Sequence, residues 1–363
     1  MSVARRDLMQ MQRLLAFFCP IVLAMLAMTG LGTGFGPTPA ASAADAAKRI
    51  VAVQFGLEHP IEASMAPIVL ASSHGLFSAE GVSVTTNIAN GAAAAIARVA
   101  SGESDLAITD INELIRFRDT PGSAPVKAVF VLFNQAPYAI IARKSRGIQV
   151  LADIEGKTLG VAEGDLAIRL WPALARQNAI KTATVKLSHV GAAVREPILS
   201  AGQVDAVSGF SYLSAVNLRD RGVPASDLAV LKFADYGCEA YGLAVIANPT
   251  FAARQPSAVK GVLRALIGGL HLAIKDPAAA ATEVAGRMDD GSRELELERL
   301  KTVLADNVLT PEVRRNGIGG IDPARMERAI DQIAADYKFR KRPTPAEIFD
   351  DSFLPPVDSR LIN

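Results

Sequence analysis

A short pattern that the chain uses twice constrains the fold more than any other feature. Residues 102–110 (GESDLAITD) and residues 202–210 (GQVDAVSGF) each begin with glycine and carry aspartate three residues later. In both, an apolar run follows and ends on small or polar residues, which predicts a buried strand preceded by a turn. We expect Asp105 and Asp205 to start these strands and to cap turns. The repetition predicts two similar lobes.

Short apolar strands alternate with helical segments along most of the chain. Strands are predicted near residues 49–55, 82–89, 105–110 and 126–133, and the alternation restarts after 138–144 with strands within 153–164, 183–191, 205–210 and 228–237. Such alternation predicts an α/β fold with two mostly parallel sheets and flanking helices. We assign lobe 1 to residues 44–137 plus 243–363 and lobe 2 to residues 138–242. Helices are expected at 256–277, 293–307 and 322–338, with a coiled tail over 339–363.

The N-terminus has the features of an export signal. Arg5, Arg6 and Arg13 form a basic region before an apolar run over residues 14–31, and the small residues at 41–43 suit cleavage. We predict a signal peptide over residues 1–43, cleaved near Ala43, and a periplasmic mature protein. A membrane anchor is the alternative, because the run is nearly long enough to span a bilayer. Both the general and the twin-arginine export routes remain open.

The composition argues against several classes of function. A net charge of +1 over 363 residues gives no reason to expect a nucleic acid partner. The four histidines lack metal-ligand spacing, and the two cysteines, Cys19 and Cys238, cannot form a disulfide framework once a signal peptide is removed. No catalytic triad pattern or phosphate-binding loop stands out. We therefore predict neither a metal nor a cofactor, and a monomer that is not an enzyme.

Several stretches resemble one known family. They include APIVLASSHGLFSAEGVSVT, DIEGKTLGV, WPALARQN, VGAAVREPILSAGQVDAVSGF and YGCEAYGLAVIANPTFAARQPSAVKGVLRALIGGLHLAIKDP. In these the chain resembles the nitrate/sulfonate/taurine class of ABC transporter substrate-binding proteins. It is most similar to the no-message-in-thiamine branch, which binds the pyrimidine precursor of thiamine. Taurine-, sulfonate-, nitrate- and riboflavin-binding relatives share much of this pattern.

The resemblance implies a two-lobed periplasmic binding protein of type II. Residues 138–144 and 241–248 would be its two crossover strands, and a separately encoded permease and ATPase would be its partners. Eukaryotic relatives of the pyrimidine branch are enzymes that use their own histidine, a cofactor and a Cys-rich iron motif. This chain has no such cysteine cluster, so a binding role is expected. Solute sensing for a membrane kinase is a further alternative.

Ligands of open α/β sheets bind beyond the carboxyl ends of the strands. We therefore expect the loops 55–65, 90–92, 109–112, 163–171 and 208–212 to face a cleft, with 235–241 at the second connection. The candidate ligand-binding residues are Phe55, Asn90, Gly91, Thr109, Asp110, Gly164, Trp171, Ser208, Phe210, Tyr212, Asp235, Tyr236, Glu239 and Tyr241.

Some of these candidates have a structural alternative. Asn90 and Gly91 precede a helix whose free N–H groups could hold an anion, but Asn90 could equally be a helix cap. Asp110 could cap the helix that follows it. Trp171, the only tryptophan, could stack on a heteroaromatic ligand or pack in the core. At least one of Phe210 and Tyr212 is expected to contact the ligand.

Residues 235–241 combine two acids and two phenols at a predicted hinge. A carboxylate there could pair with the amino and ring N–H groups of an aminopyrimidine, and Tyr236 and Glu239 are the favoured residues. A purely structural hinge is the alternative. No lysine is well placed in the cleft loops. Arg143 and Arg195 are the nearest basic candidates, and a role as surface charges is the alternative for both. This pattern favours a neutral or cationic heterocycle over an anion.

Overall fold

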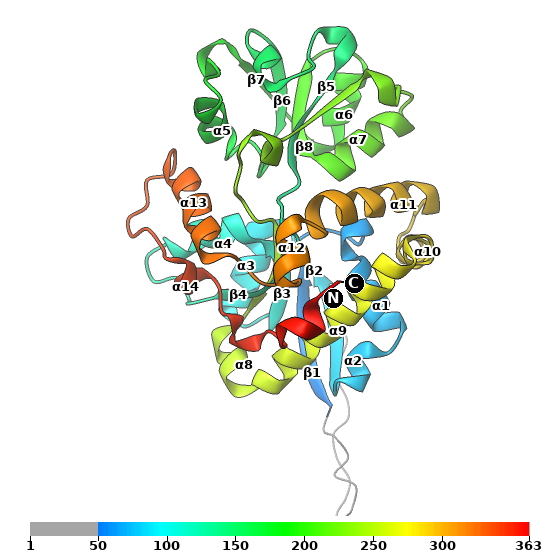
Figure 1. Cartoon of the computed structure of the whole chain (residues 1–363), viewed down its shortest axis with the longest axis vertical. Helices are drawn as coiled ribbons and strands as arrows, with labels where there is room; N and C mark the ends of the chain where they lie inside the picture. Colours follow the sequence, from blue (N-terminus) through cyan, green and yellow to red (C-terminus); the bar gives the residue numbers. More distant parts are fainter. Residues whose placement is uncertain (1–49, 363) are drawn as a thin grey trace, which may run out of the picture. The chain divides into compact units, whose positions relative to one another are not determined.

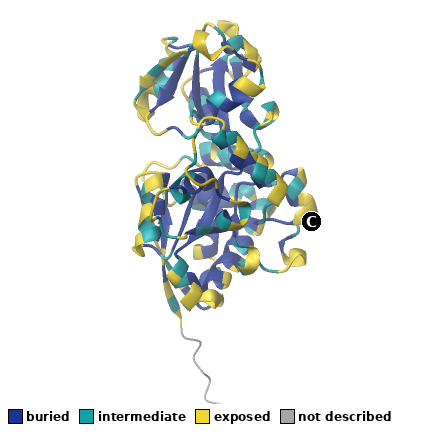
Figure 2. Ribbon diagram, turned by 90° about the vertical axis from the view of Figure 1, so that its left-hand side faces the viewer, coloured by how far each residue is buried: buried dark blue, intermediate teal, exposed yellow. Residues whose placement is uncertain are grey.

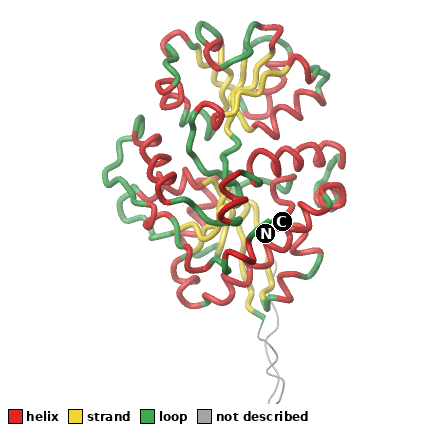
Figure 3. Tube along the Cα trace, in the orientation of Figure 1, coloured by secondary structure: helices red, strands yellow, loops and turns green. Residues whose placement is uncertain are grey.

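The structure is a computed structural model that describes residues 50–362 (Figure 1). The predicted signal peptide, residues 1–43, lies outside the described residues, as do the first residues assigned to lobe 1. Within the described part, ten strands form two five-stranded sheets, each flanked by helices (Figures 1 and 3).

The first sheet has the strand order β2-β1-β3-β10-β4. Its strands are β1 (Val51–Leu57), β2 (Val82–Ile88), β3 (Leu106–Asp110), β4 (Lys127–Val131) and β10 (Leu243–Ala247). β1 pairs in parallel with β2 and β3, whereas β10 is antiparallel to both β3 and β4. The sheet is therefore mixed, with one reversed strand.

The second sheet repeats this plan with the order β7-β6-β8-β5-β9. Its strands are β5 (Tyr138–Arg143), β6 (Thr158–Ala162), β7 (Lys186–Val190), β8 (Ala206–Phe210) and β9 (Leu228–Lys232). Here β5 is the reversed strand, between β8 and β9. The α/β fold with two sheets and flanking helices is confirmed. The exact lobe boundaries stay a prediction.

The chain passes from one sheet to the other twice. Residues 132–137 link β4 to β5, and residues 237–242 lead into β10. We expected the strands themselves, 138–144 and 241–248, to be the crossovers. Each of them is instead the first strand that the chain forms after it has passed from one sheet to the other. This explains their direction, because each enters its sheet from the end at which the other strands finish.

The repeated aspartates each fasten two parallel strands together. The carboxylate of Asp105 accepts a hydrogen bond from the backbone N–H of Gln54 in β1 at 2.8 Å, and its own N–H donates to the Gln54 carbonyl at 2.9 Å. Asp205 makes the same pair of bonds with Thr158 of β6, at 2.8 and 3.0 Å. Both aspartates thus have a structural role at a strand start, as predicted, but they bind the neighbouring strand instead of capping a turn.

Helices bury both faces of the first sheet (Figure 2). On one face α1 (Ala66–Ser73) packs against α9 (Pro256–Lys275), and α2 (Leu76–Ala79) lies beside them. By length and composition α9 could cross a membrane, but 61% of its apolar window is buried. A side chain at Gly269 would meet the carbonyl of Pro67 at 2.1 Å, so α9 is a tightly packed core helix. α3 (Ala92–Ser101) and α4 (Ile111–Arg118) supply side chains to the core on the other face.

The remaining helices complete the two halves. They are α5 (Trp171–Gln177), α6 (Arg195–Ser200), α7 (Ser211–Asp220), α8 (Pro249–Arg254), α10 (Pro277–Ala285), α11 (Arg293–Thr302), α12 (Pro311–Asn316), α13 (Pro323–Ala334) and α14 (Pro345–Ile348). The three predicted C-terminal helices are confirmed as α9, α11 and α13. The tail is not purely coil, because a capping box between Thr344 and Glu347 starts α14.

Arg325 of α13 holds both links in place. Its guanidinium donates to the carbonyl of Asn134 at 2.8 Å in the first link, and to the carbonyls of Glu239 at 2.9 Å and Ala240 at 3.3 Å in the second. It also pairs with Glu312 at 3.0 Å. A cation so fully bonded fixes the geometry of the segments about which the two sheets could move.

Candidate functional site

A cleft of about 340 Å³ lies at the carboxyl ends of strands from both sheets. The first sheet contributes residues that follow β1 and the N-terminus of α3, and the second sheet contributes residues that follow β6 and β8. The lining residues are Glu58, His59, Asn90, Gly91, Ala92, Ala93, Glu113, Ala162, Glu163, Gly164, Asp165, Leu166, Arg169, Ala192, Arg195, Phe210 and Leu213. This is the position that the strand-end rule predicts.

Glu58 forms the floor of the cleft directly after β1. One carboxylate oxygen, Oε2, accepts hydrogen bonds from the Thr109 hydroxyl at 2.8 Å and from the backbone N–H of Asp110 at 2.9 Å. The other oxygen, Oε1, has no hydrogen-bond partner among residues 50–362. Burial raises the pKa of Glu58, and the neighbouring His59 opposes this effect. The residue therefore presents one fixed and one available acceptor.

Asp110 lies beneath Glu58 and is 3% exposed. It caps α4 by accepting hydrogen bonds from the backbone N–H groups of Asn112 and Glu113, and its other oxygen accepts the Tyr138 hydroxyl. Burial and the negative charge of Glu58 raise the pKa of Asp110 to about 7. The cleft floor thus contains two adjacent buried carboxyl groups.

His59 sits beside these acids. Its Nδ1 lies 2.8 Å from the Pro60 carbonyl, and its Nε2 lies 3.7 Å from Glu62. Burial lowers the pKa of His59, but the carboxylates of Glu62 and Glu58 outweigh that effect, and the net pKa is raised. The imidazolium form is favoured by the acids around it rather than being free for an anionic ligand.

The wall from the second sheet is a closed ionic network. The Arg195 guanidinium lies 3.3 Å from Asp165 and 3.0 Å from Glu196. The Ser208 hydroxyl donates to Asp165, and the Ser214 hydroxyl donates to Glu196 at 2.6 Å. Arg195, one of the two nearest basic candidates from the sequence, is therefore part of the cleft wall, with its charge neutralised by two carboxylates.

An ion pair joins the two halves at the cleft. Arg169, which follows β6, donates to both carboxylate oxygens of Glu113 in α4, at 2.7 and 3.0 Å. Among the described lining residues, both guanidiniums are thus already paired with carboxylates, whereas four carboxylates line the cleft: Glu58, Glu113, Glu163 and Asp165. The lining favours a ligand that donates hydrogen bonds or carries positive charge.

Aromatic rings close one side of the cleft. Phe210, at the end of β8, lines it, and the Phe210 ring stacks on Tyr212 with centroids 6.2 Å apart. Tyr212 is only 1% exposed, and its hydroxyl donates to Glu62 of the other half at 3.2 Å. A flat heterocycle in the cleft would therefore meet the ring of Phe210 rather than that of Tyr212.

Four of the predicted site residues line the cleft: Asn90, Gly91, Gly164 and Phe210. Three more lie directly behind this lining, namely Thr109, Asp110 and Ser208, which hold Glu58 or Asp165. Phe55 and Trp171 are buried in the core at 0% and 3% exposure. Trp171 thus follows the core-packing alternative.

The segment 235–241 does not line the cleft. The Glu239 carboxylate faces Arg325 and Arg328 of α13, at 3.7 and 3.2 Å. The Tyr236 hydroxyl accepts the N–H of Leu151, and the Tyr241 hydroxyl donates to Glu312 at 2.9 Å. Asp235 is an exposed residue 3.9 Å from Lys232. The structural-hinge alternative describes this segment.

Sequence reasoning missed the acids and the arginines of the cleft. Glu58 and His59 directly follow the first strand, in a loop that was expected to face the cleft, so the strand-end rule alone could have identified them. Arg169 also lies in a loop that was expected to face the cleft, but its pairing with Glu113 had no such signal, because it joins residues 56 positions apart. Across residues 50–362, no group of three or more His, Cys, Asp or Glu side chains is arranged to hold a metal ion.

Comparison with known families and proteins agrees with the family resemblance. The model of the family described as NMT1/THI5 like matches residues 62–280. The 4-amino-5-hydroxymethyl-2-methylpyrimidine phosphate synthase of Schizosaccharomyces pombe is 24% identical over 247 residues, which cover 66% of this chain and 70% of the relative. The protein of the same name from Legionella pneumophila is 28% identical over 156 residues, 43% of this chain and about half of that relative, 49%.

Two solved structures of sulfonate-binding proteins have the same fold. The aliphatic sulphonate binding protein SsuA from Escherichia coli has a TM-score of 0.64 at 17% identity and covers 80% of this chain and 94% of its own. The alkanesulfonate-binding protein SsuA from Xanthomonas axonopodis, bound to MOPS, has a TM-score of 0.62 at 16% identity, with coverage of 83% and 99%. At these identities the likeness establishes the fold.

Proposed function

The chain belongs to the NMT1/THI5-like family, and we propose that it is the periplasmic solute-binding component of an ABC importer. Its solute is a thiamine pyrimidine precursor, or a similar amino-substituted heterocycle, captured between the two lobes. A permease and an ATPase, encoded separately, receive it. The fold shared with sulfonate-binding proteins supports the transport role, and the names of the curated relatives support the pyrimidine.

The state of Glu58 is the observation that carries this proposal. Its Oε2 is held by Thr109 and Asp110, while Oε1 has no partner among the described residues. A 4-aminopyrimidine carries an amino donor beside a ring nitrogen that can be protonated. A fixed carboxylate is suited to accept one or both of these N–H groups. Phe210 then offers a ring for stacking.

The charges of the cleft argue against the anionic alternatives. A sulfonate or nitrate needs free donors or cations, but Arg169 and Arg195 are each paired with carboxylates. Glu58 adds a further negative group at the floor. An anion could still use the backbone N–H groups at the start of α3, so taurine and alkanesulfonates are retained as competing ligands.

We assign binding rather than synthesis to this chain. The curated relatives carry the name of a synthase, and two solved proteins of the same fold are binding proteins. A binding protein should return its ligand unchanged after prolonged incubation, which mass spectrometry of the released compound would check. Appearance of a new pyrimidine product from the protein's own atoms would contradict the assignment.

A thermal-shift screen of residues 44–363 tests the ligand class. Its panel contains 4-amino-5-hydroxymethyl-2-methylpyrimidine, thiamine, riboflavin, taurine, alkanesulfonates and nitrate. A ligand at about 100 times its dissociation constant adds about 2.7 kcal/mol of stability, which appears as a shift of a few degrees. A shift with the aminopyrimidine alone supports the proposal. A shift with an anion instead would be compatible with a transport role but would contradict the proposal that the solute is an amino-substituted heterocycle.

Sensing remains a second candidate for the physiological role, because a closed binding protein can signal to a kinase as well as to a permease. Uptake of labelled aminopyrimidine by cells with and without the protein separates the two roles. Transport requires that uptake falls when the protein is absent.

A further inference from the structure

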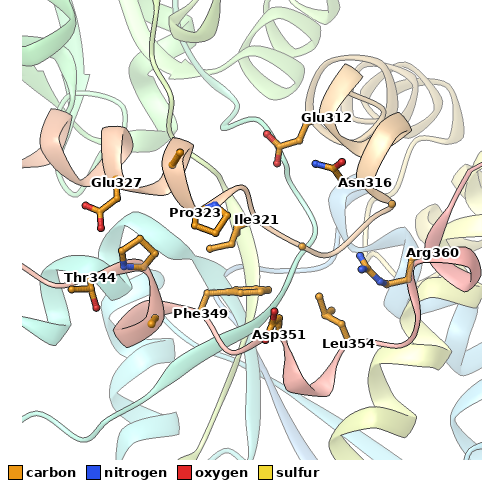
Figure 4. Close-up of a pocket in the computed structure, with 15 residues that line it drawn as sticks. Glu312, Asn316, Ile321, Pro323, Glu327, Thr344, Phe349, Asp351, Leu354 and Arg360 are labelled. Atoms are coloured by element: carbon orange, nitrogen blue, oxygen red, sulfur yellow. The ribbon is translucent and has the colours of Figure 1, made fainter.

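A second and larger cavity, of about 670 Å³, has a lining that shares no residue with the cleft (Figure 4). Its walls come from α12, the start of α13, α14 and the C-terminal segment, all within residues 312–360. None of its lining residues lines the cleft, and all lie outside residues 62–280, the part matched by the family model. Any ligand of this cavity is therefore separate from the solute in the cleft.

Arg360 is the unusual residue of this cavity. It is only 7% exposed, and it reaches the cavity from the C-terminal segment (Figure 4). Its Nε donates to the Pro355 carbonyl at 2.9 Å, and its Nη1 donates to the Ile318 carbonyl. In the described part of the chain, Nη2 has no hydrogen-bond partner and no carboxylate lies within 4.0 Å of the guanidinium. Buried charges in proteins are normally paired with an opposite charge.

The acidic residues that line the cavity do not supply a counter-charge for Arg360. Glu312 is fully engaged by Asn134, Tyr241 and Arg325. Glu327 pairs with Arg342 at 2.6 Å. The charge of Asp351 opposes the lowering of the Arg360 pKa by burial, but Asp351 is exposed and lies more than 4.0 Å from the guanidinium, so it does not form an ion pair with it.

The rest of the lining is largely apolar. Leu354, Phe349, Ile321 and Pro323 supply apolar side chains to the lining (Figure 4). Pro345 also lines the cavity. Gly320 leaves backbone close to the guanidinium, since a Cβ there would lie 3.6 Å from Nη1. One buried cation at the side of an apolar hollow is the arrangement that binds an acid with an apolar body.

We propose that this cavity is a second ligand site, specific for a small organic carboxylate with an aromatic or short aliphatic body. The carboxylate binds the free edge of the Arg360 guanidinium, which supplies the missing counter-charge. The apolar body lies against Phe349, Leu354 and Ile321. The volume of about 670 Å³ lies in the range of small-molecule sites, so a single ring or a short chain fits with room to spare.

Titration calorimetry of residues 44–363 with benzoate, and with benzamide as its neutral isostere, tests the proposal. We expect saturable benzoate binding with one site, and benzamide binding at least about tenfold weaker. Glu58→Gln, in the cleft, should leave benzoate affinity unchanged. This outcome also separates the second site from the proposed transport function, because it holds whatever the cleft binds.

Two substitutions probe the cavity itself. Arg360→Gln removes the charge and should weaken benzoate at least about tenfold, to the level of benzamide. Because Arg360 also ties down the C-terminal segment, Ala324→Trp provides an independent test. Ala324 is an exposed lining residue in the first turn of α13, so tryptophan there fills the cavity without disturbing the core. Arg314→Gln is the matched control, since Arg314 is exposed and does not line the cavity.

The proposal is overturned if benzoate shows no saturable binding at millimolar concentration, or if benzamide binds equally well. It is also overturned if Ala324→Trp binds benzoate as the wild type does. Loss of benzoate binding in Glu58→Gln would place the carboxylate in the cleft instead.

Discussion

Replacing Asp110 with asparagine should make the stability of the protein less dependent on pH. Burial and the charge of Glu58 raise the pKa of Asp110 from 3.8 to about 7 in the folded protein. Between these values the folded state binds the proton and the unfolded state has released it, so stability falls as pH rises through this range. Below pH 3.8 the protonated carboxyl group of Asp110 causes no loss of stability, and above pH 7 the loss of stability is complete.

The size of the effect follows from the shift. About three pKa units correspond to about 4 kcal/mol, which is an upper limit because Asp110 and Glu58 titrate as a pair. Asparagine does not titrate, yet its oxygen can still cap α4 and its amide can donate to the Tyr138 hydroxyl. Part of this loss is already complete at pH 5, so the loss of stability between pH 5 and pH 8 should be about 1–2.5 kcal/mol smaller in Asp110→Asn than in the wild type.

Urea denaturation at several pH values between 5 and 8 measures this difference directly. Glu163→Gln, which removes an exposed carboxylate at the cleft, is the matched control and should keep the wild-type pH dependence. If Asp110→Asn and the wild type lose the same stability between pH 5 and pH 8, this result contradicts the raised pKa of Asp110 beside Glu58.

Three further predictions follow from the fold and the links. Asp205→Ala removes the acceptor for the Thr158 N–H and should cost about 1–2 kcal/mol by urea denaturation; an unchanged midpoint would contradict the strand-fastening role. Arg325→Met removes the cation paired with Glu312 and the donor to the carbonyls of Asn134, Glu239 and Ala240, and should cost about 3 kcal/mol or more; a thermal midpoint equal to the wild type would contradict the role of Arg325 in holding the two links. Glu239→Gln should keep ligand affinity within about twofold, because its carboxylate faces α13. A large loss of affinity by calorimetry would show that residues 235–241 contribute to ligand binding.

The sequence allowed the fold to be predicted in most of its parts, because each rested on local periodicity. The twin Gly-x-x-Asp pattern led to two equivalent strands, and both aspartates have a structural role where each strand starts. The direction of β5 and β10 was not predictable in this way. An apolar run indicates a buried strand but carries no information on which way it enters the sheet.

The site was predictable only where it followed from strand ends. Asn90, Gly91, Gly164 and Phe210 line the cleft because they follow or end strands. Glu239 was assigned to the cleft for its chemistry alone, and its partner Arg328 is 89 residues later in the chain. Contacts between such distant residues leave no periodic signal, so a local cluster of acids and phenols could not be distinguished from a hinge.

The central claim is that the Glu58 carboxylate recognises an amino-substituted heterocycle, and one titration tests it most directly. The affinity for 4-amino-5-hydroxymethyl-2-methylpyrimidine would be measured by calorimetry at one pH for the wild type, Glu58→Gln and the control Asp290→Asn, which changes an exposed acid outside the cleft. A charge-assisted bond is worth about 1.5–3 kcal/mol, so Glu58→Gln should weaken binding about tenfold or more while the control binds like the wild type. Equal affinity in Glu58→Gln and the wild type, or no binding by the wild type, would contradict the claim.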